Sequence, residues 1–140
     1  MSAVDRAYCI ADLKRLARKR IPNFAFDYIE EGCNDGIAVS HNRQALDSVQ
    51  LVSQYTAQYQ EPNLTTTLFG RQYDAPVGIA PLGLSGLVWP KASIMNARTA
   101  RQANVPFVLS TVSTISIETA AQHAANNLWF QLYPPADREI

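Results

Sequence analysis

The sequence lacks an excess of charge of either sign, a cysteine framework and a long uninterrupted apolar run. Its 140 residues carry 12 basic and 12 acidic side chains, so no net field favours nucleic acid or an anionic membrane surface. Cys9 and Cys33 do not have the spacing of a zinc site, and both are interpreted as free thiols. The most apolar stretch, 76–88, is broken by glycine and proline and is shorter than the ~20 residues of a membrane span. The composition is therefore that of an ordinary globular domain.

The N-terminal ten residues contain charges at Asp5 and Arg6 and no apolar block, so no secretory signal is expected. This favours a cytoplasmic protein, with a peripheral position at the inner membrane as the alternative. His41 and His123 have no acidic or thiol partner at ligand spacing, so both are interpreted as ordinary surface or core histidines. No metal site is predicted.

Residues 1–50 are predicted to form a helical preface. Apolar residues recur at helical spacing over Ile10–Ile21, and the basic cluster Lys14–Arg20 is interpreted as the solvated face of that helix. A second helix is predicted over Pro22–Gly32, because proline suits a first helical turn and glycine a helix end. A third helix is predicted over Asp35–Val49.

Residues 51–74 are predicted to contain a hairpin. Thr65–Phe69 and Arg71–Tyr73 are rich in β-branched and aromatic residues, and Gly70 separates them.

From residue 75 to residue 140 short apolar runs alternate with helical stretches. Strands are predicted at Val77–Ala80, Val105–Leu109 and Leu128–Leu132, and helices at Lys91–Ala103 and Ile115–Ala125, with the start of another at Asp137–Ile140. This alternation is typical of βαβ units around a buried parallel sheet.

Ligands of parallel α/β proteins bind beyond the carboxyl ends of the strands, so the residues after each apolar run are candidates for a site. Pro81 and Gly83 follow the first run and could lie along a flat ring, although an ordinary βα turn explains them equally well. Ser110 follows the second run, and a cap of the next helix is the alternative role. Gln131 and Tyr133 are two residues apart, which predicts that they share one face of the third strand.

Several short motifs occur in order from about Ile10 to Ile140, and each of them is weak alone. They are Phe26-Asp27-Tyr28 with Gly32, Asn42-Arg43, Thr65-Thr66-Thr67 with Gly70, Ile79-Ala80-Pro81 with Gly83, Leu109-Ser110-Thr111, Ser116 with Glu118, and Trp129-Phe130-Gln131-Leu132-Tyr133. Together they resemble the FMN-dependent α-hydroxy acid dehydrogenases and oxidases, a family that includes glycolate oxidase, L-lactate dehydrogenase and mandelate dehydrogenase.

The resemblance implies an α/β fold, a (β/α)8 TIM barrel with a helical preface, of which this chain carries the first three strands. It implies FMN as the cofactor and oxidation of a small (S)-2-hydroxy acid to the 2-oxo acid. Oxygen, a quinone or a cytochrome would accept the electrons, and full-length relatives are expected to be homo-oligomers.

The resemblance also implies roles for individual residues. Ala80, Pro81, Leu82, Gly83, Ser110 and Gln131 correspond to the family's flavin-binding positions, and Tyr28 and Tyr133 to its substrate-binding tyrosines, with Tyr133 at the catalytic centre. A buried helix aromatic is the alternative for Tyr28.

The chain also departs from the family pattern. Leu82 stands where many members have threonine, and Ser93 stands where many have a glutamate after a His-Pro pair. The run Trp89-Pro90-Lys91 is more similar to mandelate-dehydrogenase-like members, which favours a bulky or aromatic substrate.

The family's histidine base, with its two arginines and lysine, has no counterpart among these residues, so the 140-residue chain alone is expected to be inactive. Two alternatives stay open. One is a truncated, non-catalytic product, and the other is an FMN barrel of another kind, such as an isomerase or a nucleotide dehydrogenase.

Overall fold

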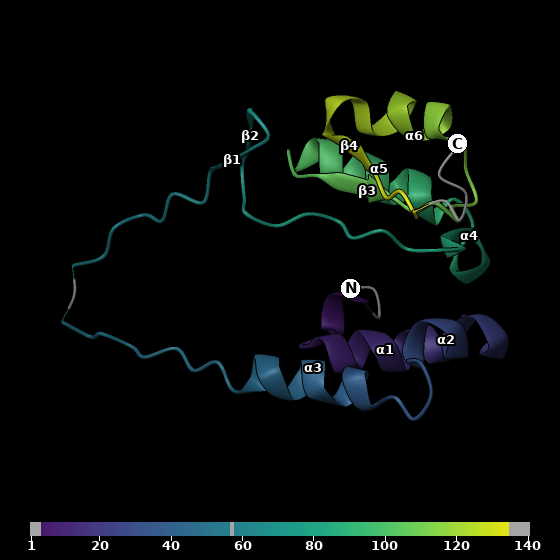
Figure 1. The fold of residues 1–140 in the computed structure, drawn as a ribbon. Helices are drawn as coiled ribbons and strands as arrows, with labels where there is room; N and C mark the ends of the chain where they lie inside the picture. Colours follow the sequence, from purple (N-terminus) through teal and green to yellow (C-terminus); the bar gives the residue numbers. More distant parts are fainter. Residues whose placement is uncertain (1–3, 57, 135–140) are drawn as a thin grey trace. The chain divides into compact units, whose positions relative to one another are not determined.

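The computed structural model describes residues 4–56 and 58–134 and divides the chain into two compact units, Met1–Glu61 and Pro62–Ile140 (Figure 1). Each unit is described by itself. Within the described residues, no helix has both the length and the apolar character needed to cross a bilayer.

The first unit is helical. It contains a short 3-10 helix at Val4–Arg6 and the helices α1 (Ile10–Arg18), α2 (Asn23–Glu30) and α3 (Ile37–Asp47), so the three predicted helices are confirmed. Pro22 is the residue before α2 rather than part of its first turn, with extended backbone at φ −55° and ψ 143°. Both cysteines of this unit are free and exposed, as predicted.

Contacts between charged side chains connect α1 with α2. Lys14 pairs with Glu30, and the Arg18 guanidinium donates to the Asp27 carboxylate at 2.6 Å. The Arg18 guanidinium also lies 4.6 Å from the ring centre of Phe26, which is buried. The basic cluster of α1 is therefore a solvated face, as predicted, and this face also holds the adjacent helix.

The second unit begins with the hairpin that the sequence predicts. Strands β1 (Thr66–Leu68) and β2 (Arg71–Tyr73) pair antiparallel, with Leu68 opposite Arg71. The two connecting residues, Phe69 and Gly70, have φ angles of 49° and 77°. Positive φ at both central positions is the requirement of a type I′ turn, whose twist matches that of the paired strands.

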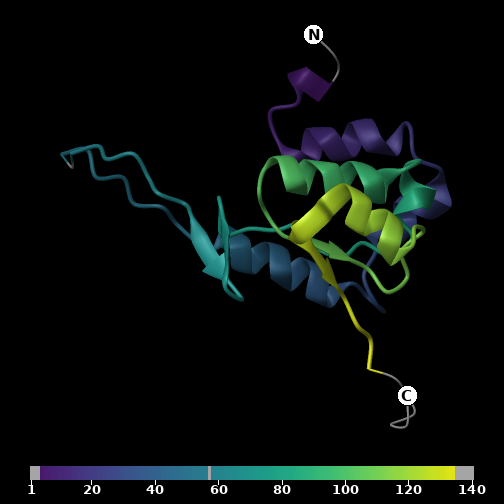
Figure 2. The same ribbon diagram turned by 90° about the horizontal axis from the view of Figure 1, so that it is seen from above.

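A parallel α/β layer follows the hairpin. Strand β3 (Phe107–Leu109) pairs in parallel with β4 (Leu128–Phe130), and Ile79 forms a single parallel bridge to Phe107 on the other side of β3. Helices α5 (Ala92–Gln102) and α6 (Ile117–Ala124) lie side by side against this pair (Figures 1 and 2). The shorter α4 (Ser85–Val88) and the 3-10 turn Ala125–Asn127 complete the unit.

One core cluster holds the layer together. Its buried members are Ala97, Ala100, Val105, Phe107, Leu109, Ala120 and Ala124. The four alanines allow both helices to approach the strands closely, and the aromatic and branched residues of β3 fill the space between them.

Three features differ from the sequence predictions. The predicted strand Val77–Ala80 is reduced to the bridge at Ile79, and Val77 is 64% exposed rather than buried. The reason is that a strand requires neighbours, and no described residues pair with the open side of this segment. Strand β4 ends at Phe130, so Leu132 lies beyond it and is exposed.

Helix α4 was not predicted. It has one turn and starts after Leu84, which adopts a left-handed conformation at φ 49°. An apolar pattern cannot reveal so short a helix. The predicted helix at Asp137–Ile140 lies outside the described residues.

Candidate functional site

Three parallel segments end at the same edge of the second unit. The bridge of Ile79 to Phe107 and the pairing of Leu109 with Phe130 fix their order and direction. The residues that follow them, 80–83, 110–113 and 131–133, therefore lie along one edge. This is the edge at which parallel α/β proteins bind ligands.

Ser110 lies directly after β3 and is 4% exposed. Its hydroxyl oxygen accepts a hydrogen bond from the Val112 N–H at 3.3 Å. The interpretation of Ser110 as a helix cap is wrong, because Ser116 caps α6 by accepting from the Thr119 N–H at 3.2 Å. Within the described part of the chain no acceptor binds the Ser110 hydroxyl proton, which remains available to a ligand or a solvent molecule.

The segment Ala80–Gly83 is irregular, and its backbone donors are unused. The N–H groups of Ala80, Leu82 and Gly83 donate no hydrogen bond to any residue that the structure describes, and Pro81 has no N–H. Backbone donors in this state are available to the polar edge of a ligand.

The segment is connected to the loop that follows β3. The Leu84 N–H donates to the Val112 carbonyl at 3.0 Å. A methyl group on Gly86 would lie 2.5 Å from the Thr114 hydroxyl oxygen, so glycine is needed for this close approach. The two loops that line the edge therefore hold each other in place.

Gln131 and Tyr133 differ in how firmly they are held. The Gln131 N–H donates to the Leu109 carbonyl at 2.9 Å, and its own carbonyl accepts from the Thr111 hydroxyl. Its side-chain amide makes no hydrogen bond with the described residues. Tyr133 is 50% exposed and lies beyond the end of β4, so the premise that both residues belong to one strand is wrong.

Tyr28 belongs to the first unit, on the last turn of α2. It is 54% exposed, so the alternative of a buried helix aromatic is wrong. Its hydroxyl has no hydrogen-bond partner among residues 4–56 and 58–134. The structure therefore leaves this phenol without a hydrogen bond in its own unit. The predicted residues of the second unit lie together at one edge of that unit.

A group of serines behind the edge was missed by the sequence analysis. Ser85 of α4, Ser93 of α5 and Ser113 of the loop after β3 are connected by their hydroxyls, with oxygen separations of 2.6 Å and 3.4 Å. They are spread over 29 positions of the sequence, and no spacing rule relates them. Only the departure from the family pattern at Ser93 pointed to this region.

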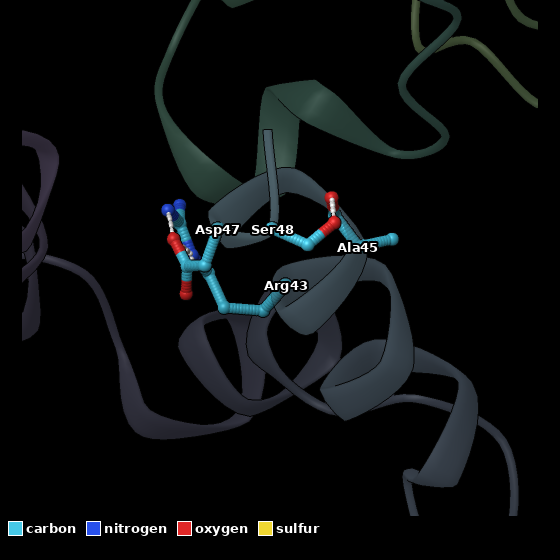
Figure 3. Close-up of polar contacts among 4 residues, drawn as sticks. All are labelled: Arg43, Ala45, Asp47 and Ser48. Carbon is cyan, nitrogen blue, oxygen red and sulfur yellow. Dashed lines mark hydrogen bonds and ion pairs between the residues drawn. The ribbon is translucent and has the colours of Figure 1, made fainter. Parts of the chain in front are cut away.

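The carboxyl groups whose pKa is shifted lie on helices, and the edge segments 80–83, 110–113 and 131–133 contain none of them. The Arg43 guanidinium holds the pKa of Asp47 below its ordinary value on α3 (Figure 3), and the Tyr8 N–H does the same for the pKa of Asp12. Backbone and Ser116 hydrogen bonds lower the pKa of Glu118 at the start of α6. No described cluster of histidine, cysteine and carboxylate side chains could hold a metal ion. The edge thus offers neutral hydrogen-bonding groups.

The donor set fits the polar edge of a flavin. A flavin ring presents both acceptors and donors along its pyrimidine portion, and the edge supplies backbone N–H groups, a hydroxyl and a free amide. Residues 80–83, Ser110 and Gln131 could therefore hold such a ring without a charged side chain.

Comparison with known proteins gives one family. The family model described as FMN-dependent dehydrogenase matches residues 17–140. The chain is 37% identical over 124 residues to (S)-mandelate dehydrogenase of Pseudomonas putida, covering 89% of this chain and 32% of that protein. It is also 37% identical over 128 residues to L-lactate dehydrogenase of Xanthobacter autotrophicus, covering 91% and 33%.

Solved structures give the same result. An oxidized active mutant of (S)-mandelate dehydrogenase superposes with a TM-score of 0.83 at 37% identity, over 91% of this chain and 36% of that one. A mandelate oxidase superposes with a TM-score of 0.83 at 32% identity, over 92% and 37%. The chain thus spans about a third of the length of the relatives that it matches.

Proposed function

We propose, from the premise that the chain belongs to the FMN-dependent dehydrogenase family, that it carries N-terminal flavin- and substrate-binding residues of an enzyme that oxidises (S)-2-hydroxy acids to 2-oxo acids. The observation that carries the proposal is the row of unused neutral hydrogen-bonding groups along one edge of the parallel layer. In the proposed enzyme this layer is the first part of a (β/α)8 barrel, whose strand ends form the active site.

In this proposal the N–H groups of 80–83 and the Ser110 hydroxyl bind the flavin ring, and the Gln131 amide binds its pyrimidine edge. FMN, when bound, supplies the acceptor for the two electrons that the substrate loses. Leu82 brings no hydroxyl, but its backbone N–H stays available. The protein's contribution is to fix these donors in direction before the ring binds.

The substrate side depends on two phenols. Tyr28 and Tyr133 each have a hydroxyl without a partner in the described residues, and a phenol O–H is a suitable donor to a carboxylate or an alcohol. We assign them to the 2-hydroxy acid, with Tyr133 at the reacting centre. The relatives named (S)-mandelate dehydrogenase and mandelate oxidase support a bulky or aromatic substrate.

The remaining assignments rest on the relatives alone. One solved (S)-mandelate dehydrogenase is described as membrane-associated, and another relative is a lactate oxidase. Our proposal for location is a cytoplasmic protein, with a peripheral membrane position as the alternative. The homo-oligomer and the electron acceptor, which is oxygen, a quinone or a cytochrome, are proposed from the family resemblance. We expect the 140 residues alone to be inactive, because neither His41 nor His123 corresponds to the family's histidine base; the Nδ1 of His123 on α6 accepts from the Arg98 Nε at 3.4 Å.

The test of the flavin site compares two glutamines. Gln131→Leu removes the amide at the edge, whereas Gln122→Leu changes an exposed position on α6. A lost hydrogen bond to a buried partner costs about 1–3 kcal/mol, so in a completed barrel we expect FMN to dissociate about 5- to 150-fold more readily from Gln131→Leu than from Gln122→Leu. Flavin fluorescence titration measures both constants. Equal constants for the two variants would remove Gln131 from the site.

A further inference from the structure

A small cavity lies behind Ser110, between α4, the first half of α5 and the end of β3. Its volume is about 10 Å³. Its polar lining consists of Ser85, Ser93, Asn96, Ser110 and Ser113, and its apolar lining includes Phe107 and Leu109. Three of these hydroxyl-bearing side chains, Ser85, Ser93 and Ser110, are at least 95% buried. Each of these three hydroxyl groups has at least one hydrogen-bond partner, and a hydroxyl group can make up to three hydrogen bonds, so some of their capacity is unused.

The serine hydroxyls that line the cavity do not use all of their protons on one another. Four serine hydroxyls offer four protons, and the two oxygen contacts, of Ser85 with Ser93 and of Ser93 with Ser113, use one proton each. The Val112 and Ile115 N–H groups occupy acceptor positions on Ser110 and Ser113 and take up no proton. Two hydroxyl protons are therefore left without an acceptor among the described residues, and the Asn96 amide also lacks a bond.

The size of the cavity and the polar groups that line it indicate that a water molecule is the occupant. A volume of about one water-sized probe is the smallest that holds a water molecule, and a buried water typically makes two to four hydrogen bonds. Water has two protons, one for the free lone pair of the Ser110 oxygen and one for the Asn96 carbonyl. Its lone pairs can accept the free proton of the Ser85–Ser93–Ser113 group, which leaves the Ser110 proton for another ligand. No carboxylate lines the space, so a cation would lack a counter-charge.

We propose that this cavity is an internal water site, and that the water connects the Ser110 hydroxyl with the Ser85–Ser93 pair. The site then couples three parts of the second unit, which are α4, α5 and the loop after β3. By donating to the Ser110 oxygen, the water fixes the direction of that hydroxyl. The water proposal depends only on the cavity and its lining residues. Binding of a flavin by the Ser110 hydroxyl depends on the proposed function.

The decisive measurement is a crystal structure of the chain at about 1.5 Å resolution. We expect one water peak at hydrogen-bond distance, ~2.6–3.2 Å, from the Ser110 oxygen and from at least one of the Ser93 oxygen and the Asn96 amide. A dry cavity, or one closed by a rotated side chain, would overturn the proposal.

A solution experiment tests the same site without crystals. Oxygen-17 relaxation dispersion of water counts long-lived internal waters, and the Ser93→Val variant fills the cavity and removes the central hydroxyl. We expect the dispersion amplitude to fall by the equivalent of one water in Ser93→Val and to stay unchanged in Thr99→Val, an exposed position of the same helix. Equal amplitudes in Ser93→Val and the parent chain would refute the site.

The outcome is separable from that of the flavin proposal. A bound water together with equal FMN affinities of the two glutamine variants would keep the water site and reject the flavin edge. A dry cavity together with weaker FMN binding by Gln131→Leu would reject the water site and keep the flavin edge.

Discussion

The two units of the chain are stabilised by different physical means. The four described ion pairs all join residues of the first unit, and among the described residues of that unit only Ala25 and Phe26 are buried. The second unit has a continuous apolar cluster and a buried hydroxyl network. Exposed ion pairs contribute little and are screened by salt, whereas buried apolar area is neither screened nor titrated. We therefore expect the first unit to respond to salt and pH, and the second to the volume of its side chains.

The largest expected effect is the loss of a core aromatic in the second unit. Phe107 is 3% exposed at the centre of the cluster, and its replacement by alanine costs about 3–5 kcal/mol. We expect amide hydrogen exchange in α5, α6 and β3 to accelerate by about two to four orders of magnitude in Phe107→Ala. Phe24→Ala, at a 66% exposed position of α2, is the matched change in the first unit and should alter exchange there by less than tenfold.

Similar losses of protection in Phe107→Ala and Phe24→Ala would contradict this difference between the units, because the first unit would then depend on apolar burial as strongly as the second.

A smaller effect is expected at Gly86 of the second unit, whose backbone lies close to the Thr114 side chain. In Gly86→Ala the new methyl group would overlap Thr114, at a cost of about 1–3 kcal/mol, while alanine in a helix recovers up to ~1 kcal/mol. We expect the protection of the Leu84 amide, which bonds the Val112 carbonyl, to fall by about tenfold in hydrogen exchange.

The double variant Gly86→Ala with Thr114→Ala provides the control. It removes the Thr114 hydroxyl oxygen and methyl group, leaves the Cβ at 3.0 Å from the new methyl group, and should recover much of the lost protection. If it does not, the contact between the two loops is not the cause of the loss, and packing tolerance in this unit is larger than we infer.

Elements with a local cause could be predicted from the sequence. The hairpin follows from β-branched flanks around Phe69-Gly70, and the preface helices follow from apolar spacing. The segment Val77–Ala80 could not be predicted, because an apolar run becomes a strand only where another strand pairs with it. The order of the site segments could therefore be predicted from the sequence, but the first and last residue of each strand could not.

The site shows the same limit. The edge formed by residues 80–83, Ser110 and Gln131 follows from the rule that ligands bind at strand ends, together with the family motifs. Whether Ser110 or Ser116 caps α6 depends on where the helix starts, and sequence patterns locate such boundaries poorly. The serine cavity depends on the packing of α4 against α5 and the following loop, which no local pattern encodes.

The smallest expected effect concerns a single ion pair of the first unit, on α3. The Arg43 side chain donates from its Nε to both Asp47 oxygens, at 2.9 Å and 3.0 Å (Figure 3). This contact lowers the pKa of Asp47 below the ordinary value of 3.8. Because the folded pKa is depressed, the stabilisation is present above pH 3.8 and is lost as the pH falls through the folded pKa. The helix should therefore weaken only in acid.

Carbon-13 detection of the Asp47 carboxyl during a pH titration measures this directly. We expect a pKa below 3.8 in the parent chain and a return toward 3.8 in Arg43→Gln, with a similar return in 1 M salt because the exposed pair is screened. Gln44→Ala, one position along the same helix, should leave the titration unchanged, since among the described residues the hydrogen bonds and the charge that shift the pKa of Asp47 come from Arg43. If Asp47 titrates at its ordinary pKa in the parent chain, the pair is not formed in solution, and the contrast between an electrostatic first unit and an apolar second unit loses its clearest example.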